Sequence, residues 1–594
     1  MILQALTDYY DILRQSGADD IPARWYSREK ISYCLVLSDS GDLIHIISLL
    51  ELVQRGKKEM EVPQVMIVPE RIQRSGTKPN ANFLYDNLKF TLGIENAQTK
   101  KTQRKYFEKF KELHQTILKN VSCPEAKAFL LFLDKWQPEQ AFNHPILQPF
   151  LENPLFLKAN LVFQLDGGDY LHENQEICRA WEEYKQKNQS AVLGQCLITG
   201  KENVPIAKLN PQTRGIRGGQ TTGCSLVSFN EPAYLSYGKE QGENAPISEA
   251  AAFQYGTVLN YLVADQKHKL YLGDTTVVYW AHSVQKAYQD VAALLFDPDE
   301  LEAEQPEAGT MIYDPHAVKL VRAVMEQVAA GLPITTIPEL DPATQFYVLG
   351  LAPNAARLSV RFFVQNRFDV FVAKLAKHYQ DLQIERQRAA DREFLPLWLL
   401  LRQTVSEKVR DKACSPLLAG AVLRAILTGL AYPATLFSNV MLRLKAGDDI
   451  NYARAAIIKA YLIRRNIDTE VLTMSLNVQT ENVAYQLGRL FAVLEKLQED
   501  ANGSSNIRER YFSACSATPA VVLPILLRLA QHHIAKSDYG AASDRRIAQI
   551  LEKIDLEKNP IPKNLSLEEQ GVFVLGYYHQ RNDLYRKKED RIWE

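Results

Sequence analysis

Residues 214–230 read RGIRGGQTTGCSLVSFN, which combines four glycines with two arginines and a run of small polar side chains. Glycine lets the backbone take positive φ values and approach a ligand closely. Arg214 and Arg217 carry charges that do not titrate, and the neighbouring Gln, Thr, Ser and Asn side chains donate and accept hydrogen bonds. This composition predicts a loop that binds a shaped anion such as a phosphodiester backbone, anchored by a short strand at Leu226-Val227.

An ordinary turn is the alternative reading of this segment, because glycine-rich polar stretches commonly form turns. The segment has neither the Gly-Lys-Ser/Thr of a P-loop nor the spacing of a dinucleotide-binding loop. Its glycines at 215, 218, 219 and 223 are the positions where positive φ or close approach is expected. The nucleic-acid contacts predicted here are Arg214, Arg217, Gly218, Gly219, Gln220, Thr221, Thr222 and Asn230, followed by Asn244.

A second polar loop is predicted at residues 71–82, which read RIQRSGTKPNAN and show no apolar periodicity. Its cationic and amide side chains are of the kinds that grip phosphates and contact base edges. A solvated surface loop is the alternative. The candidate contacts in this loop are Arg71, Arg74, Lys78, Asn80 and Asn82.

Residues 346–364 predict a β-hairpin whose strands join through Pro353-Asn354-Ala355. Side chains alternate between the two faces of a strand. Arg357, Ser359 and Arg361 are therefore expected on one face, with Leu358, Val360 and Phe362 on the other. Two arginines on one face suit phosphate contacts, although pairing with acidic neighbours is an equal alternative.

The composition is that of an ordinary globular protein, with 46% hydrophobic and 23% charged residues in a chain of 594. A chain of this length predicts two to four domains. The formal net charge of −1 excludes a uniformly basic coat but not a local basic surface. No apolar run is long enough to span a membrane, and no signal peptide is recognisable, so the protein is expected in the cytoplasm. The seven cysteines form no C-x-x-C pair and predict free thiols.

The apolar periodicity changes near residue 370, from strand-like alternation to helical spacing. The predicted fold class is α+β, with a mixed α/β N-terminal region followed by an all-helical C-terminal bundle. The predicted domains are residues 1–365, a helical connection at 366–473, and a bundle at 474–594. Within the helical part, Arg454, Lys459 and Arg464-Arg465 predict a further basic cluster, and Asp448-Asp449 predicts a helix N-cap.

No pattern in the sequence indicates catalysis. The eleven histidines form no H-E-x-x-H motif, and no nucleophile elbow is present. We therefore expect a non-enzyme that needs no cofactor and no metal. The alternative is a metal-dependent nuclease or nucleotide-binding enzyme with its site at residues 214–230, which would need a carboxylate cluster for Mg²⁺.

Several segments together resemble one known family. They closely resemble the large subunit of type I-C CRISPR Cascade, an RNA-guided surveillance complex. Their order along residues 1–365 makes the likeness specific. The segments are MILQALTDYY at 1–10, NFLYD at 82–86, Leu92-Gly93, CLITG at 196–200, RGIRGGQTTG at 214–223, LVSFN at 226–230, SYG at 236–238, NAPIS at 244–248, TVVYWA at 276–281 and PNAARLSVR at 353–361.

The resemblance implies a role in antiviral defence. In that family the guide RNA reads target sequence, while the large subunit reads a short protospacer-adjacent motif in double-stranded DNA and helps to open the duplex. It also holds the displaced strand, lies beside backbone, RNA-processing and small helical subunits, and receives the helicase–nuclease. The resemblance further implies that a small helical subunit is made from an internal start, for which Met474 is the candidate.

Overall fold

The computed structural model describes residues 1–586 with several gaps. Contacts within the chain divide it into two compact units, one of residues 1–213 with 225–261 and one of residues 214–224 with 262–594. The predicted three-domain division stays a prediction. The residues outside the description are 18–19, 56–57, 73–78, 97–98, 100, 299–314, 331–339, 389, 410–413, 468, 555–559 and 587–594.

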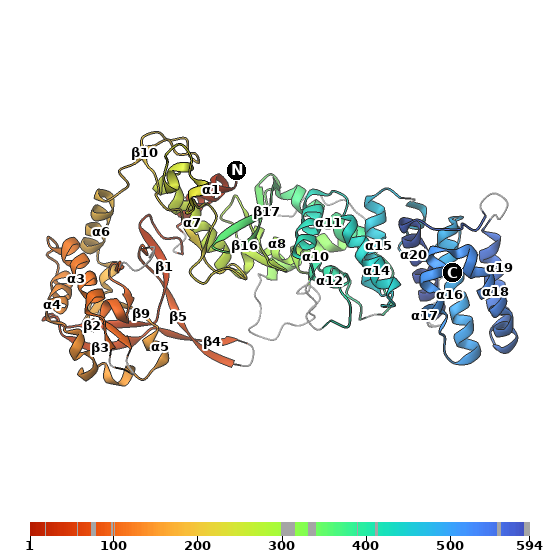
Figure 1. Ribbon diagram of the computed structural model, residues 1–594, viewed down its shortest axis with the longest axis horizontal. Coiled ribbons are helices and arrows are strands. Elements are labelled where there is room, and N and C mark those ends of the chain that lie inside the picture. Colours follow the sequence, from red (N-terminus) through yellow and green to blue (C-terminus); the bar gives the residue numbers. More distant parts are fainter. Residues whose placement is uncertain are drawn as a thin grey trace. The chain divides into compact units, whose positions relative to one another are not determined.

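Unit 1 contains two main sheets (Figure 1). The first has the antiparallel order β1-β5-β4, and the second has the order β3-β2-β9-β6 with a parallel pair between β2 and β9. β2 is buried along its whole length, as expected for a central strand without polar alternation. The strands are β1 (Tyr26–Ile31), β2 (Tyr33–Leu37), β3 (Leu43–Ser48), β4 (Leu50–Arg55), β5 (Lys58–Pro69), β6 (Asp86–Asn87) and β9 (Asn160–Leu165), with short strands β7 (Ile94–Asn96), β8 (Lys101–Thr102), β10 (Leu193–Gly194), β11 (Val204–Pro205) and β12 (Gln212–Thr213).

An aromatic core around His114 supports unit 1. The buried His114 ring stacks on Phe83, its Nδ1–H donates to the Phe110 carbonyl at 2.6 Å, and its Nε2 accepts from the Leu84 N–H at 2.8 Å. Burial lowers the pKa of His114 to about 3, so the ring stays neutral. The helices of this unit are α1 (Ile2–Gln15), α2 (Leu88–Thr91), α3 (Arg104–Leu118), α4 (Pro124–Lys135), α5 (Pro154–Leu157), α6 (Gln175–Lys187) and α7 (Glu249–Ala264), the last running on into unit 2.

Unit 2 begins with a sheet in the order β13-β17-β16-β15-β14. Its long hairpin, β16 (Gln345–Asn354) and β17 (Arg357–Arg367), confirms the hairpin expected from the sequence. β15 (Thr275–Ala281) is buried throughout, β14 (Lys269–Leu272) is the last strand of the order, and β13 (Cys224–Ser225) lies beside β17. One face of the sheet packs against helices α8 (Ala287–Phe296), α11 (Phe368–Leu382) and α13 (Pro416–Thr428).

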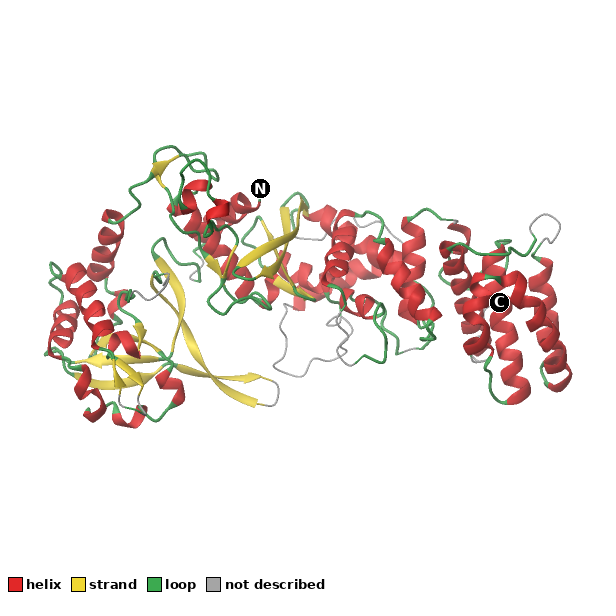
Figure 2. Ribbon diagram, in the orientation of Figure 1, coloured by secondary structure: helices red, strands yellow, loops and turns green. Residues whose placement is uncertain are grey.

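The described chain after residue 367 is helical (Figure 2), which confirms the predicted fold class. Local signals set several helix starts: Ser566 and Glu569 form the expected capping box of α20, and Pro519 occupies the first turn of α18. The other helices of unit 2 are α10 (Pro315–Ala329), α12 (Leu397–Arg402), α14 (Ala434–Lys445), α15 (Tyr452–Arg464), α16 (Val483–Asn502), α17 (Ile507–Ala517), α18 (Pro519–Lys536), α19 (Gly540–Glu552) and α20 (Leu567–Tyr585).

Two glycines let α16 and α20 approach closely in the C-terminal bundle. A Cβ at Gly488 would lie 2.0 Å from the Phe573 carbonyl oxygen, and one at Gly576 would lie 2.2 Å from the Tyr485 carbonyl oxygen. Backbone atoms of a packed helix cannot move aside as a flexible side chain can. The two helices therefore meet at a spacing that only glycine permits at these positions.

The structure predicts that Gly488→Ala destabilises the bundle. Overpacking a close helix contact costs about 1–3 kcal/mol, which lowers the thermal unfolding midpoint. Gly420→Ala is the matched control, because Gly420 lies inside α13 with no atom near the position of a new Cβ, and alanine favours a helix by about 1 kcal/mol. Equal midpoints for the two variants would contradict the close packing.

The basic cluster predicted in the helical region is wrong for Arg454, Lys459 and Arg464, whereas Arg465 is exposed. Arg454 is fully buried and donates to Glu407 at 3.0 Å and Asp448 at 3.2 Å. Lys459 is also buried and donates to the Gln383 carbonyl at 2.6 Å. The apolar residues between these cations lie on every side of α15, so the helix is buried all round and its charges pair internally.

Two further expectations for this region are corrected. Arg464 is paired with the buried Asp381, at 2.8 Å. The N-cap of α15 is Asn451, whose Oδ1 accepts from the Arg454 N–H, rather than Asp448 or Asp449. The two aspartates neutralise arginines instead, because burying an unpaired guanidinium is costly.

Lys459 gives this region a predicted pH dependence. Burial lowers the pKa of Lys459 from 10.5 to about 8. Because the unfolded chain holds this proton up to higher pH than the folded chain does, the cost of charging Lys459 is fully present below pH 8 and disappears as pH rises toward 10.5. Wild type should therefore gain stability relative to Lys459→Met across that window. Thermal midpoints of both proteins from about pH 7 to 10 measure this difference, and a constant difference would contradict the shift.

No helix among the described residues is long and apolar enough to cross a membrane.

Candidate nucleic-acid interface

The glycine segment of unit 2 forms a loop with the backbone freedom expected of it. Gly215, Gly218 and Gly223 have φ values of 81°, 76° and 112°, where other residues are strained. Gly219 does not have positive φ; it is required for space, because a Cβ there would lie 3.0 Å from the Cys224 Sγ. The anchoring strand is Cys224–Ser225 and not the expected Leu226-Val227.

Two hydrogen bonds hold residues 214–224 against the end of the sheet, and Gly218 lies beside it. The Arg217 backbone N–H donates to the Thr276 Oγ1 at 3.3 Å, and the Cys224 thiol donates to the Ala355 carbonyl at 3.6 Å. A Cβ at Gly218 would lie 3.5 Å from Pro353. Pro353 and Ala355 belong to the β16–β17 hairpin end, so the loop and the hairpin, predicted separately, form one surface.

Arg217 points its charge over an aromatic ring on the outer strand of this sheet. Its guanidinium carbon lies 5.7 Å from the centre of the Tyr271 ring, and the Lys269 Nζ lies 5.7 Å from the same centre. Tyr271 is partly exposed. A cation over a tyrosine face is held by the ring quadrupole, and such a surface suits both phosphate and base stacking.

Tyr271 and Lys269 did not emerge from the sequence. Their alternation in KLYL places them on one face of a strand, but no local signal links them to Arg217, which lies some fifty residues earlier in the chain. The contact depends on the long-range pairing of the sheet.

A β-bulge changes the predicted faces of β17. Phe362 pairs with Gly350 and Val360 pairs with Leu351, so Arg361 is the extra residue between them. Val360 and Arg361 are both exposed while Phe362 is buried. The regular alternation expected for residues 357–362 is therefore wrong, because a bulge adds one residue to one strand.

The two hairpin arginines have different surroundings. Arg361 is partly exposed, and its Nη2 lies 3.4 Å from the Asp274 Oδ2 in the β14–β15 turn. Arg357 is half-buried and lies opposite Asn354 at the end of the hairpin. An exposed pair such as Arg361–Asp274 contributes little to stability, so this cation can exchange its partner for a phosphate at small cost.

The loop at residues 71–82 belongs to unit 1. Asn82 is buried, and its Oδ1 accepts from the Ile72 N–H at 3.1 Å while its own N–H donates to Asp86 at 2.9 Å. Asn82 therefore fixes the two ends of the loop. Arg71 and Asn80 are exposed, and Arg71 lies 3.9 Å from Glu29. Arg74 and Lys78 lie outside the described residues.

Asn244 organises the exposed loop that follows Asn230. Its Oδ1 accepts from the Ser236 N–H at 2.9 Å, and its Nδ2 donates to the carbonyls of Lys239 and Gln241 at 3.2 and 3.0 Å. The loop presents Tyr237 at its tip, 98% exposed and with a φ of 54°. A bulky residue held at positive φ marks a constrained loop. Asn230 itself is exposed and accepts from the Ser228 hydroxyl at 3.3 Å.

The comparison with protein families gives a match along nearly the whole chain. The family described as CRISPR-associated protein (Cas_Csd1) matches residues 6–585. The chain belongs to this family. This family is the large subunit of type I-C Cascade, as the motifs indicated. A comparison with curated proteins gives no match.

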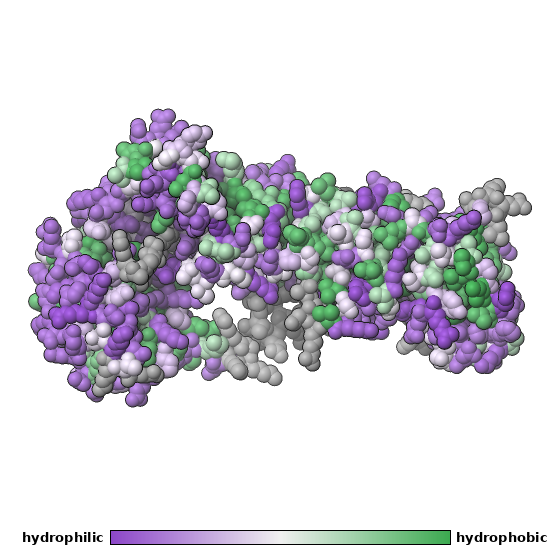
Figure 3. Space-filling view, viewed as in Figure 1, coloured by the Kyte–Doolittle hydropathy of each residue, from purple (hydrophilic) through white to green (hydrophobic). Residues whose placement is uncertain are grey.

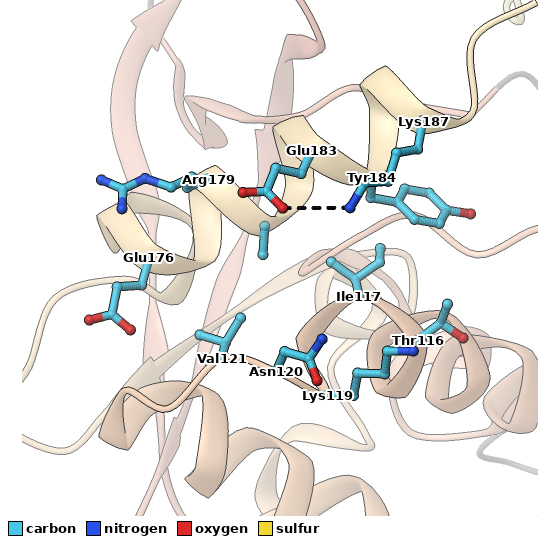
Figure 4. A pocket seen from close by; sticks show the side chains of 11 residues that line it. Thr116, Ile117, Lys119, Asn120, Val121, Glu176, Arg179, Glu183, Tyr184 and Lys187 are labelled. Carbon is cyan, nitrogen blue, oxygen red and sulfur yellow. Dashed lines mark ion pairs between the residues drawn. The ribbon is translucent and has the colours of Figure 1, made fainter.

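In this Cas_Csd1 chain, a separate hollow lies between α3 and α6 of unit 1 (Figure 4). Its volume is about 460 Å³, and its lining includes Lys119, Arg179 and Lys187 as well as Glu176 and Glu183. Lys187 already pairs with Glu183 at 3.7 Å. The charges of both signs give no preference for an anion, and none of the predicted nucleic-acid contacts lines the hollow.

The glycine loop and the sheet beside it carry several cationic and hydrogen-bonding side chains. In unit 2 the cations Arg214, Arg217, Lys269, Arg357 and Arg361 come from the loop and the sheet beside it. Within the part of the chain that the structure describes, no three His, Cys, Asp or Glu side chains are grouped to hold a metal ion.

Proposed function

We propose that this chain recognises target double-stranded DNA within an RNA-guided complex. The observation that carries the proposal is the union of the glycine loop with the hairpin end in unit 2. There Arg217 of the loop and Lys269 of β14 lie over the partly exposed ring of Tyr271, and Arg357 and Arg361 belong to the hairpin. Membership of the Cas_Csd1 family implies nucleic acid and other CRISPR-associated proteins as partners.

The proposed division of labour follows from the contacts. Arg214, Arg217, Arg357 and Arg361 bind phosphates and fix the register of the DNA. Only base-edge contacts distinguish an adjacent motif, and we assign these to the loops around Asn80 and Gln220, with Arg71, Arg74, Lys78, Thr221 and Thr222 beside them. The family resemblance supports duplex opening, holding of the displaced strand and docking of the helicase–nuclease as further roles.

Tyr237 supports the duplex-opening part of the proposal. Aromatic side chains stack on unpaired bases with an affinity that depends little on sequence. The loop around Tyr237 is held by the three hydrogen bonds of Asn244 and by the Lys239 N–H, which donates to the Ser236 carbonyl at 3.0 Å. A ring presented in this way is ready to meet a base as the strands part.

The proposed role is binding and gating in the cytoplasm, without bond cleavage. The competing function is a metal-dependent nuclease at the glycine loop. Incubation of the purified chain with end-labelled DNA and Mg²⁺ or Mn²⁺ separates the two. If wild type cleaves the DNA and Arg217→Gln does not, the glycine loop is a nuclease site and the proposed non-catalytic role is wrong.

Phosphate contacts predict a specific salt dependence. Arg217→Gln and Arg357→Gln should each weaken DNA binding regardless of sequence, and each should reduce the slope of log K against log salt by about one. Arg104→Gln is the matched control, because Arg104 is exposed on α3 and pairs with Glu108. Fluorescence anisotropy across a salt series measures the slopes. If both variants keep the wild-type slope of log K against log salt, these two arginines do not contact DNA phosphates.

Base reading predicts a different effect at Asn80 and Gln220. Loss of a good base contact costs about 1–3 kcal/mol of discrimination. Asn80→Ala and Gln220→Ala should therefore narrow the affinity gap between correct and incorrect motifs on duplex DNA, with a smaller effect on DNA opened in advance by mismatches. Gln549→Ala, at an exposed position on α19, is the control. Asn82→Ala should narrow the gap indirectly, because Asn82 fixes the loop ends. Full discrimination in Asn80→Ala and Gln220→Ala would place motif reading elsewhere.

The C-terminal bundle predicts a second gene product. Met474 is exposed and lies shortly before α16, so a product that starts there keeps the α16–α20 pair with its glycine contacts. We expect intact-mass analysis of the complex expressed from the native gene to find this fragment. Met474→Leu should remove it while leaving the full chain folded, because the Met474 backbone contact to Glu385 remains possible. A native complex without any C-terminal fragment would contradict the prediction.

A further inference from the structure

The β4–β5 hairpin projects from the three-stranded sheet of unit 1 (Figure 1), and β4 is the last strand of that sheet. Gln64 donates its N–H to the Leu49 carbonyl, and the register continues with Leu50 opposite Pro63. Hydrogen-bonded and non-hydrogen-bonded pairs alternate along an antiparallel ladder. The N–H groups of Glu51 and Val53 therefore face β5, and those of Leu52 and Gln54 face away from it.

The two long edges of this hairpin differ in how they are protected. On β5 the positions that face away from β4 are Glu59, Glu61 and Pro63, and charges and proline are the usual means of blocking a sheet edge. On β4 the corresponding positions are Leu52 and Gln54. At these outward-facing positions the β4 edge thus carries neither a charge nor a proline.

Apolar side chains are exposed on both faces of the hairpin. Leu52 is 71% exposed on one face, and Val53 and Met60 are 38% and 47% exposed on the other. Figure 3 shows hydrophobic residues on the part of the hairpin that is not grey. A flat partner surface would cover one face and leave the other in water. A strand added beside β4 would cover Leu52 and Val53 together, because its own side chains alternate between the same two faces.

The charge around Leu52 indicates the chemistry of the partner. Glu51, Glu59 and Glu61 are exposed among the apolar residues. The hairpin also contains three cations, Arg55, Lys57 and Lys58, in the stretch from the last residue of β4 to the first residue of β5. Carboxylates repel a phosphate backbone and favour lysine or arginine. The acidic stretch beside Leu52 therefore fits a basic protein segment better than a phosphate backbone.

We propose that β4 accepts an extended segment of a partner protein as an added strand. The segment carries apolar residues opposite Leu52 and Val53 and a lysine or arginine opposite Glu51. Backbone hydrogen bonds to Leu52 and Gln54 supply affinity, and the alternating side chains supply selectivity. The inference rests on the proposed function for the assembly in which the partner is sought, namely the RNA-guided complex.

Amide hydrogen exchange at single-residue resolution tests the edge directly. The full chain is measured alone and in the complex assembled with guide RNA and the other subunits, without DNA. Exchange of the Leu52 and Gln54 amides should slow by about tenfold or more on assembly. The Glu51 and Val53 amides, already bonded to β5, serve as internal controls and should change much less.

Two variants at one position separate the backbone from the side chain. Leu52→Pro removes the outward N–H without removing a β4–β5 hydrogen bond, while Leu52→Ala removes only apolar surface. The free variants should share the wild-type unfolding midpoint. In a pull-down, the assembled subunits should retain at least about tenfold less of the Leu52→Pro chain than of the Leu52→Ala chain.

Each contrary result overturns the proposal in a distinct way. If the Leu52 and Gln54 amides stay unprotected in an assembled complex, no strand is added beside β4. The same follows if Leu52→Pro is retained as well as wild type. Either result leaves the proposed function standing. Protection that appears in the free chain with rising concentration identifies a second copy as the occupant. Protection that appears only when DNA is added identifies nucleic acid. A wild-type chain that joins no such complex overturns both this inference and the proposed function.

Discussion

The proposed binding surface depends on the close approach of a glycine loop to the end of one β-hairpin. Gly219 leaves room for the Cys224 thiol, which donates to the Ala355 carbonyl, and Gly218 lies beside Pro353. A Cβ at Gly219 would lie 3.0 Å from the Cys224 Sγ and 3.2 Å from the Ile216 carbonyl oxygen, and Gly218 has a positive φ that strains other residues, so a side chain at either position disturbs this approach. That approach decides where Arg217 lies, and with it the pairing of the loop's charge with Tyr271.

The cations of this surface have partners that they can give up at a small cost in stability. Arg361 has an exposed partner in Asp274, and Arg217 lies over a partly exposed ring. The cations of α15 show the opposite arrangement, since Arg454 is fully buried between Glu407 and Asp448. A cation can bind an incoming phosphate only where losing its present partner is cheap. Under the proposed function, this contrast is how a chain with a net charge near zero offers a local surface for nucleic acid.

Local patterns in the sequence predicted the elements, and long-range packing decided the details. The hairpin at residues 345–367 and the helix at 567–585 followed from alternation and a capping box. The bulge at Arg361 could not be seen, because RLSVRF at residues 357–362 alternates regularly as a sequence. Tyr271 could not be predicted as part of the site, because only the pairing of strands far apart in the sequence brings it near Arg217. The sequence of α15 indicates its burial in part, because alanine and isoleucine residues lie next to its cations.

The central claim is that the loop at residues 214–224 and the hairpin end together hold DNA. Photo-cross-linking from target duplex DNA that carries 4-thiothymidine, followed by mass spectrometry of the digested complex, tests it most directly. If the loop and the hairpin end both hold DNA, cross-linked peptides come from both 214–224 and 354–367, and both are lost when Gly219→Val displaces the loop. Cross-links confined to other segments, with both of these peptides unmodified, would contradict it.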